Sequence, residues 1–78
     1  MKVELVEDGS PVILAECPTG PFLFEGVVGF KSEYSDNNGF IHAFNEGGEY
    51  FWAGAGIPAN QRKLVVQPLR MVKTLYAH

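Results

Sequence analysis

The sequence predicts an all-β fold: a five- to six-stranded barrel of the SH3-like or OB-like kind, with a small two-sheet β-sandwich as the alternative. Two observations carry this prediction. Nine glycines and five prolines divide the 78 residues into short pieces. The pieces are short apolar runs rich in Val, Phe, Tyr and Ile, and none keeps the 3.6-residue period of an amphipathic helix. At this length we expect one domain, residues 1–78.

The N-terminal part is expected to contain two strands. The first covers residues 2–6 and ends at a turn over residues 8–11, where Gly and Pro follow an Asp. The second covers residues 12–16. A loop follows at residues 17–21, because its two prolines cannot donate to a strand ladder.

The third strand is expected to be long, covering residues 22–34. Simple alternation places several apolar side chains on one of its faces, namely Phe22, Phe24, Val28, Phe30 and Tyr34. Gly26 and Gly29 interrupt this strand and predict a bulge or a sharp bend.

Residues 34–53 are expected to form a three-strand meander. The Asn-Gly pair in the turn at residues 36–39 supplies the positive φ angles of a tight hairpin. A strand at residues 40–45, a turn at 46–48 and a strand at 49–53 follow.

The C-terminal part is expected to hold a connection and one strand. The connection covers residues 54–61, with one helical turn opened by Pro58. The last strand covers residues 63–72, in which Pro68 requires an edge position or a bulge.

Charge is distributed unevenly along the chain. Residues 1–49 hold all nine acids against two bases, a balance of −7, and residues 50–78 hold four bases and no acid, a balance of +4. The two parts could neutralise each other across the sheet, or form an acidic and a basic face. The total of −3 argues against non-specific nucleic-acid binding, although a compact basic spot could hold one small anion.

The composition also argues against other classes of protein. No apolar run approaches the length of a membrane helix, and the charged first residues are unlike a signal peptide. Cys17 is the only cysteine, so no internal disulfide can form, and we expect a buried apolar residue there rather than a nucleophile. The sequence predicts no metal site and no cofactor, a reducing cytoplasmic setting, and stabilisation as a homo-oligomer.

No catalytic residue is predicted, so we expect a protein that is not an enzyme. Hydroxyl and thiol groups occur, but none stands in a recognisable arrangement with a base and an orienting group. His42 alternates with Phe40 and Phe44, so all three should point to one side of a strand, which is typical of a packed histidine.

Aromatic, glycine and basic residues follow one another between Tyr50 and Lys63. Aromatic rings offer stacking surface, glycine lets a ligand approach the backbone, and Arg and Lys contact anions. This combination favours a nucleotide-like ligand. The candidate ligand-binding residues are Lys31, Tyr50, Trp52, Gly54, Gly56, Arg62 and Lys63. The alternative is that the rings only pack within a half-buried sheet.

Three further residues are candidates for contact with a partner, namely Glu25, Glu33 and Tyr34. Glu33 and Tyr34 end the long predicted strand just before the Asn-Gly turn, where a rim would present Lys31 and Glu33 to a ligand or partner. The alternative is an exposed Lys31–Glu33 pair with the tyrosine on the core face.

Residues 24–54 resemble a group of small, mostly uncharacterised bacteriophage and prophage proteins. The shared pattern is a short apolar strand, Lys31-Ser32-Glu33-Tyr34, a turn, a strand at residues 40–44, and the run from Gly48 to Trp52 before a Gly-rich stretch. The resemblance implies no catalytic residue. It implies an accessory protein that acts in the host cytoplasm by binding a host defence protein or a defence signal.

Three functions are compatible with these features. The first is sequestration of a small anionic or nucleotide-like signal of a host defence system. The second is protein–protein inhibition, in which the acidic part of the chain covers a basic surface on a host nucleic-acid-binding or defence protein. The third is a structural or assembly module of the virion.

Overall fold

The structure, a computed structural model, describes residues 2–74. Its elements follow in this order: β1 (Lys2–Glu7), β2 (Val12–Ile13), the 3-10 helix η1 (Leu14–Glu16), β3 (Gly20–Phe24), β4 (Val27–Ser35), β5 (Ile41–Asn45), α1 (Pro58–Arg62) and β6 (Val65–Thr74). The prediction of a small, mostly-β fold is confirmed. The short helix α1 opens at Pro58 as expected, since proline suits the first turn of a helix.

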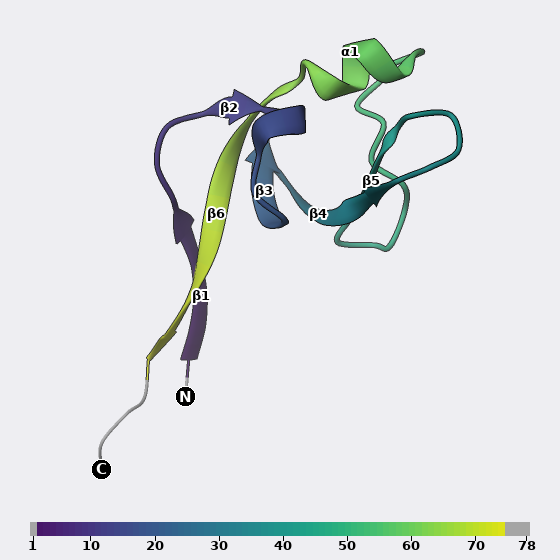
Figure 1. The fold of residues 1–78 in the computed structure, drawn as a ribbon. Helices are drawn as coiled ribbons and strands as arrows, with labels where there is room; N and C mark the ends of the chain where they lie inside the picture. Colours follow the sequence, from purple (N-terminus) through teal and green to yellow (C-terminus); the bar gives the residue numbers. More distant parts are fainter. Residues whose placement is uncertain (1, 75–78) are drawn as a thin grey trace.

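The strands form one antiparallel sheet in the order β1-β6-β3-β4-β5, and β2 pairs with β6 outside this path (Figure 1). Within residues 2–74, β1 and β5 stand at the two ends of the order and do not pair with each other. Strand pairing therefore leaves the sheet open and does not close it into the predicted barrel.

The last strand, β6, organises the sheet by changing partner along its length. Its first two residues pair with β2, the next two with β3, and the rest with β1. Pro68 lies at the second change: it is opposite Phe22, and its carbonyl accepts a hydrogen bond from the Asp8 backbone N–H at 2.9 Å. The pairing of β1 with β6 brings the first acidic strand beside the last basic one, as the cross-sheet alternative predicts.

The predicted long strand at residues 22–34 is wrong, because it is two strands. A two-residue turn at Glu25 and Gly26, with φ of 47° and 81°, joins β3 to β4. Positive φ at both positions suits the twist of a hairpin. The expectation that Phe22 and Phe30 lie on one face is wrong for the same reason. The register places Phe22 opposite Gly29 on the inner face of the sheet, which holds the core, and Phe30 opposite Phe44 on the outer face.

The two turns around β5 lie where the sequence predicts them, but the first is not the tight hairpin expected, because Gly39 has a positive φ and Asn38 does not. In each, one side-chain oxygen accepts hydrogen bonds from two backbone N–H groups of its own turn: Asp36 Oδ1 at 2.9 and 3.0 Å, and Asn45 Oδ1 at 2.9 and 3.0 Å. The strand expected at residues 49–53 is reduced to an isolated bridge between Tyr50 and Phe44. The strand expected at residues 12–16 is also shorter, because η1 replaces its second part.

The core lies on the inner face, under η1. Its buried members are Leu14, Cys17, Phe22, Ile41, Ala43, Phe51 and Val66. The rings of Phe22 and Phe51 meet edge to face with centroids 5.0 Å apart. The prediction that Cys17 is a buried apolar residue is confirmed.

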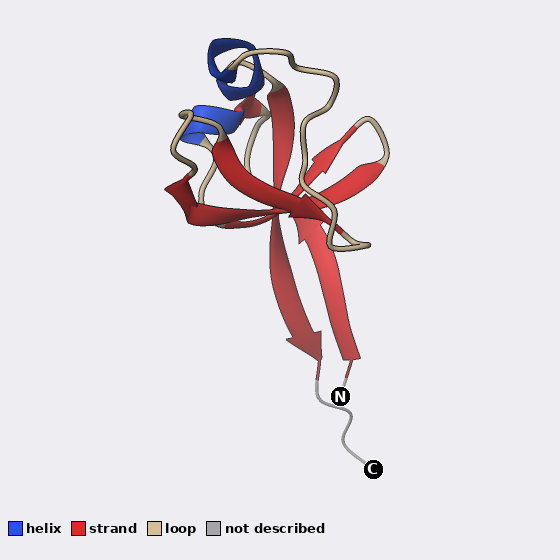
Figure 2. Ribbon diagram, turned by 90° about the vertical axis from the view of Figure 1, so that its right-hand side faces the viewer, coloured by secondary structure: helices blue, strands red, loops and turns tan. Residues whose placement is uncertain are grey.

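One part of the sheet projects beyond this core. The projecting ribbon, which we call the arm, consists of β1 and residues 69–74 of β6 (Figures 1 and 2). It accounts for the elongated shape, 51 × 25 × 21 Å, and for a radius of gyration of 13.7 Å. A compact chain of this length would have a radius of about 11.5 Å.

Candidate functional site

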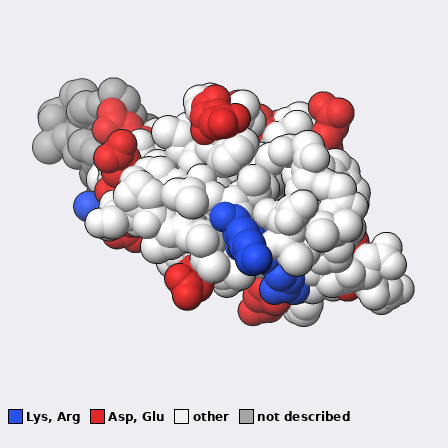
Figure 3. All heavy atoms as spheres, turned by 90° about the horizontal axis from the view of Figure 1, so that it is seen from above, with Lys and Arg blue, Asp and Glu red and all other residues white. Residues whose placement is uncertain are grey.

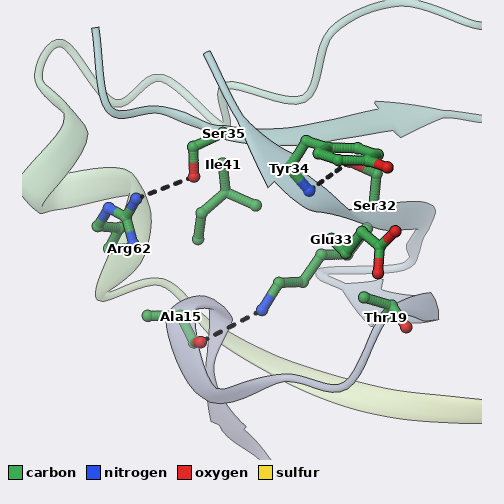
Figure 4. A pocket seen from close by; sticks show the side chains of 9 residues that line it. Ala15, Thr19, Ser32, Glu33, Tyr34, Ser35, Ile41 and Arg62 are labelled. Carbon is green, nitrogen blue, oxygen red and sulfur yellow. Dashed lines mark hydrogen bonds between the residues drawn. The ribbon is translucent and has the colours of Figure 1, made fainter. Parts of the chain in front are cut away.

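Two surfaces could carry function, and the first is a pocket beside β4. The register of β4 against β5 shifts between Lys31 and Ser35, which is a β-bulge. A pocket of about 300 Å³ lies there. It is lined by Ala15, Thr19, Lys31, Ser32, Glu33, Tyr34, Ser35, Ile41 and Arg62 (Figure 4). We call it the bulge pocket.

Lys31 is held by the backbone of the segment beneath it. Its Nζ donates to the carbonyl oxygens of Leu14 at 2.8 Å, Ala15 at 3.2 Å and Cys17 at 2.6 Å. An ammonium group has three donors, so all of them are matched. Burial lowers the pKa of Lys31; Cys17 opposes this shift and the charge of Arg62 adds to it. The ammonium group therefore stabilises η1, which limits what it can offer a ligand.

Arg62 reaches the same pocket from the end of α1. Its Nε donates to the Gly39 carbonyl at 3.0 Å, and one terminal nitrogen donates to Ser35 Oγ at 3.1 Å, on the side of the pocket away from Glu33 and Thr19 (Figure 4). Seen from the α1 end, basic side chains form a compact group with acidic side chains around it (Figure 3). A group of basic side chains is therefore present at this end of the molecule, where the sequence left open a compact basic spot for one small anion.

The second surface is a group of aromatic rings on the outer face of β4 and β5, which we call the aromatic cluster. Its members are Phe30, Phe40, His42, Phe44, Tyr50 and Trp52. Tyr50 and Trp52 are stacked, with centroids 4.3 Å apart and an interplanar angle of 22°. The expectation that His42 points with Phe40 and Phe44 is consistent with the ring contacts, since His42 meets Phe44 edge to face at 4.7 Å.

The aromatic cluster has an acidic border. The Tyr50 hydroxyl donates to Asp36 Oδ2 at 3.3 Å. Burial raises the pKa of Tyr50, and the charge and hydrogen bond of Asp36 raise it further. Asp36 lies in the turn before β5, and the exposed Glu46 and Glu49 lie in the turn after it.

The structure divides the predicted ligand-binding residues between the two surfaces. Lys31 and Arg62 meet in the bulge pocket, while Tyr50 and Trp52 belong to the outer face, since Tyr50 bridges Phe44. The remaining three, Gly54, Gly56 and Lys63, lie in the connection before α1 and at its end.

The predicted partner-binding residues are divided as well. Glu33 and Tyr34 line the bulge pocket, whereas Glu25 lies in the β3–β4 turn. Sequence reasoning missed Thr19, Ser32 and Ser35 as lining residues, because no local signal marks the bulge. It missed Phe30 as a member of the aromatic cluster because it took β3 and β4 for one strand.

Cys17 lies close to a cation, since the Lys31 ammonium group donates a hydrogen bond to its carbonyl. Burial nevertheless raises the pKa of the thiol, and this outweighs the lowering effect of Lys31. The described residues contain no group of three or more His, Cys, Asp or Glu side chains that could hold a metal ion. Among residues 2–74 there is no helix with the length and apolar character needed to cross a membrane.

The chain matches no family model, no curated protein and no solved structure. The resemblance to bacteriophage and prophage proteins therefore stays a prediction.

Proposed function

We propose that this protein is a non-enzymatic binding protein whose aromatic cluster docks onto a protein partner. The partner presents an apolar surface surrounded by basic side chains. The observation that carries the proposal is the exposure of two members of the cluster. Trp52 is 42% accessible although it packs against Phe40 and Tyr50, and Phe30 is 43% accessible opposite Phe44, whereas Phe40 is buried. Contiguous exposed apolar surface on a small soluble domain is typical of an interaction site. Large aromatic side chains are also the usual anchors of protein interfaces.

The chemistry of the partner follows from the acidic border. Asp36 precedes β5, and Glu46 and Glu49 follow it, so negative charge lies at both ends of the strand that carries His42 and Phe44. Complementary charge at an interface rim steers association and selects partners. A partner with Lys or Arg around an apolar centre therefore fits, as in the acidic inhibitor that the charge distribution suggests.

A random-peptide display selection on the whole chain tests the proposal. We expect enriched peptides to combine aromatic or aliphatic residues with flanking Lys or Arg, and to change the emission of Trp52, the only tryptophan. The reversal Glu46→Lys with Glu49→Lys should weaken binding, and salt should weaken it in the unmodified chain. Enriched peptides that are acidic, or that bind without any change in Trp52 emission, would overturn the proposal.

A second candidate function is capture of a small anion or nucleotide in the bulge pocket. The observation in its favour is that Lys31 and Arg62 converge there, and within residues 2–74 no carboxylate forms an ion pair with Arg62. Calorimetry with linear and cyclic nucleotides, and mass spectrometry of small molecules released by heat, test it. Binding that Arg62→Ala abolishes would support this function. An absence of heat and of released nucleotide would exclude it.

The biological setting rests on the resemblance. The protein could act in a host cytoplasm against a defence system, or it could be assembled into a virion. Mass spectrometry of purified particles distinguishes the two, since only a virion module would be present there. The SH3-like or OB-like assignment of the open sheet likewise remains a proposal, which a solved structure would test.

A further inference from the structure

The arm presents an uncovered apolar face. The register pairs Val3 with Lys73, Leu5 with Met71, and Glu7 with Leu69, and residues directly opposite each other share a face. On that face Val3 is 50%, Leu5 is 39% and Met71 is 60% accessible.

The arm is also a ribbon of only two strands. Among the described residues, β1 ends the strand order, and β3 pairs with β6 only at residues 67 and 68, before the arm begins. Both edges of the ribbon are therefore unpaired, and no other element extends along it in Figures 1 and 2. A two-stranded ribbon is marginally stable in water by itself, so a partner that covers its apolar face would stabilise it.

The charges on this face select a second copy of the chain as the partner. Lys73 lies at the tip of the arm and Glu7 at its base, four residue pairs apart, which is about 14 Å along the ribbon. If two arms pack face to face in opposite directions, each Lys73 comes next to the Glu7 of the other copy. If they pack in the same direction, like charges meet.

We propose that two copies of this protein form a twofold-symmetric dimer in which the apolar faces of their arms pack together, antiparallel, with Val3, Leu5, Leu69 and Met71 in the centre and Glu7–Lys73 pairs at both ends. Such a contact is closed, because each copy contributes the same surface. A face about 20 Å long and two strands wide is at the small end of protein interfaces, so a weak dimer is expected.

Sedimentation measurements between about 10 µM and 1 mM test the dimer and its charges. Glu7→Lys and Lys73→Glu should each raise the Kd at least tenfold, and the double variant should restore it to within about threefold. Within one arm the two residues are about 14 Å apart, beyond the Debye length of about 10 Å at 0.1 M salt, so restoration reports contact between copies. Arg70→Glu is the matched control: it changes the net charge as Lys73→Glu does, on the other face of the arm, and should leave the Kd unchanged.

The orientation has a test of its own. Chains carrying Glu7→Cys and chains carrying Lys73→Cys are mixed and treated with a short bis-maleimide, while the native Cys17 is protected by burial. The antiparallel dimer predicts cross-links mainly between the two kinds of chain. A monomer up to 1 mM, a predominant link between two Lys73→Cys chains, or a dimer indifferent to both single charge reversals would each overturn the proposal.

Discussion

The side chain of Gln61 pairs with both backbone groups of Ile41. Its Oε1 accepts the Ile41 N–H, and its Nε2 donates to the Ile41 carbonyl at 3.0 Å and to the Phe51 carbonyl at 3.0 Å. Gln61 is fully buried, and the helix that carries it is five residues long. A helix this short gains little from its own hydrogen bonds, so this amide fixes α1, and with it Arg62, against β5.

Gln61→Leu should therefore be strongly destabilising. The leucine fills a similar volume but leaves one N–H and two carbonyls without their partner, which should lower the free energy of unfolding by about 3–5 kcal/mol in urea titrations. Gln67→Leu is the matched control, because the Gln67 amide is only partly buried and donates to the carbonyls of Gly9 and Pro68. It should cost about 1 kcal/mol. Equal losses for the two variants would contradict this account of Gln61.

Gly29→Ala tests the packing of the inner face. A Cβ at this position would clash with the end of the Phe22 ring, and Phe22 is fully buried, so its ring has to move. Overpacking of this kind should cost about 1–3 kcal/mol of the free energy of unfolding. Gly56→Ala, where no atom lies within 4 Å, should be nearly neutral. In a chain with Phe22→Leu the added cost of Gly29→Ala should shrink, and independent effects of the two changes would disprove the contact.

Lys31→Met separates a structural role of this lysine from a ligand-binding one. Loss of the bonds to three carbonyls should lower the free energy of unfolding by about 2 kcal/mol and loosen η1. The buried thiol of Cys17 should then react faster with a thiol reagent under native conditions. Lys63→Met, at an exposed position, should change neither quantity. If Lys31→Met left stability and thiol reactivity unchanged, the contacts of Lys31 with the three carbonyls would not contribute to the stability of the fold.

Tyr50 should lose its phenolic proton at a higher pH than an ordinary tyrosine, and the free energy of unfolding should therefore fall at alkaline pH. Because its pKa is raised in the folded protein, the unfolded chain loses this phenolic proton first as the pH rises. The contribution to stability is complete below pH about 10, the ordinary pKa of tyrosine, and is lost as the pH passes through the raised pKa. Absorbance titration of the phenols, with Tyr50→Phe to assign the signal, measures the shift. Asp36→Asn should reduce it, and an unchanged titration in that variant would contradict the assigned cause.

Local chemistry made much of the fold predictable. Residue preferences predict the turns at residues 36–39 and 46–48 from their glycines, the helical turn from Pro58, and the burial of Cys17. The hairpin between β3 and β4 was not predictable in this way, because a glutamate occupies its first positive-φ position, where Asn or Gly is the usual signal.

The site was less predictable than the fold, since its parts come together only through register. Which face carries Phe30 depends on that hairpin, and the bulge between Lys31 and Ser35 depends on how β4 meets β5. Alternation within one strand correctly grouped Phe40, His42 and Phe44. It could not separate Tyr50 and Trp52 from the cations, because that separation is a property of the whole sheet.

The proposal that the aromatic cluster binds a protein partner is tested most directly by measuring the affinity of the chain for a selected peptide. The unmodified chain, Trp52→Ser and Ile57→Ser are compared by calorimetry; Ile57 is also exposed, at 53%, but lies outside the cluster, in the connection before α1. Removal of an interface anchor should weaken binding at least tenfold in Trp52→Ser, while Ile57→Ser should bind like the unmodified chain. Equal affinities for all three would contradict the assignment.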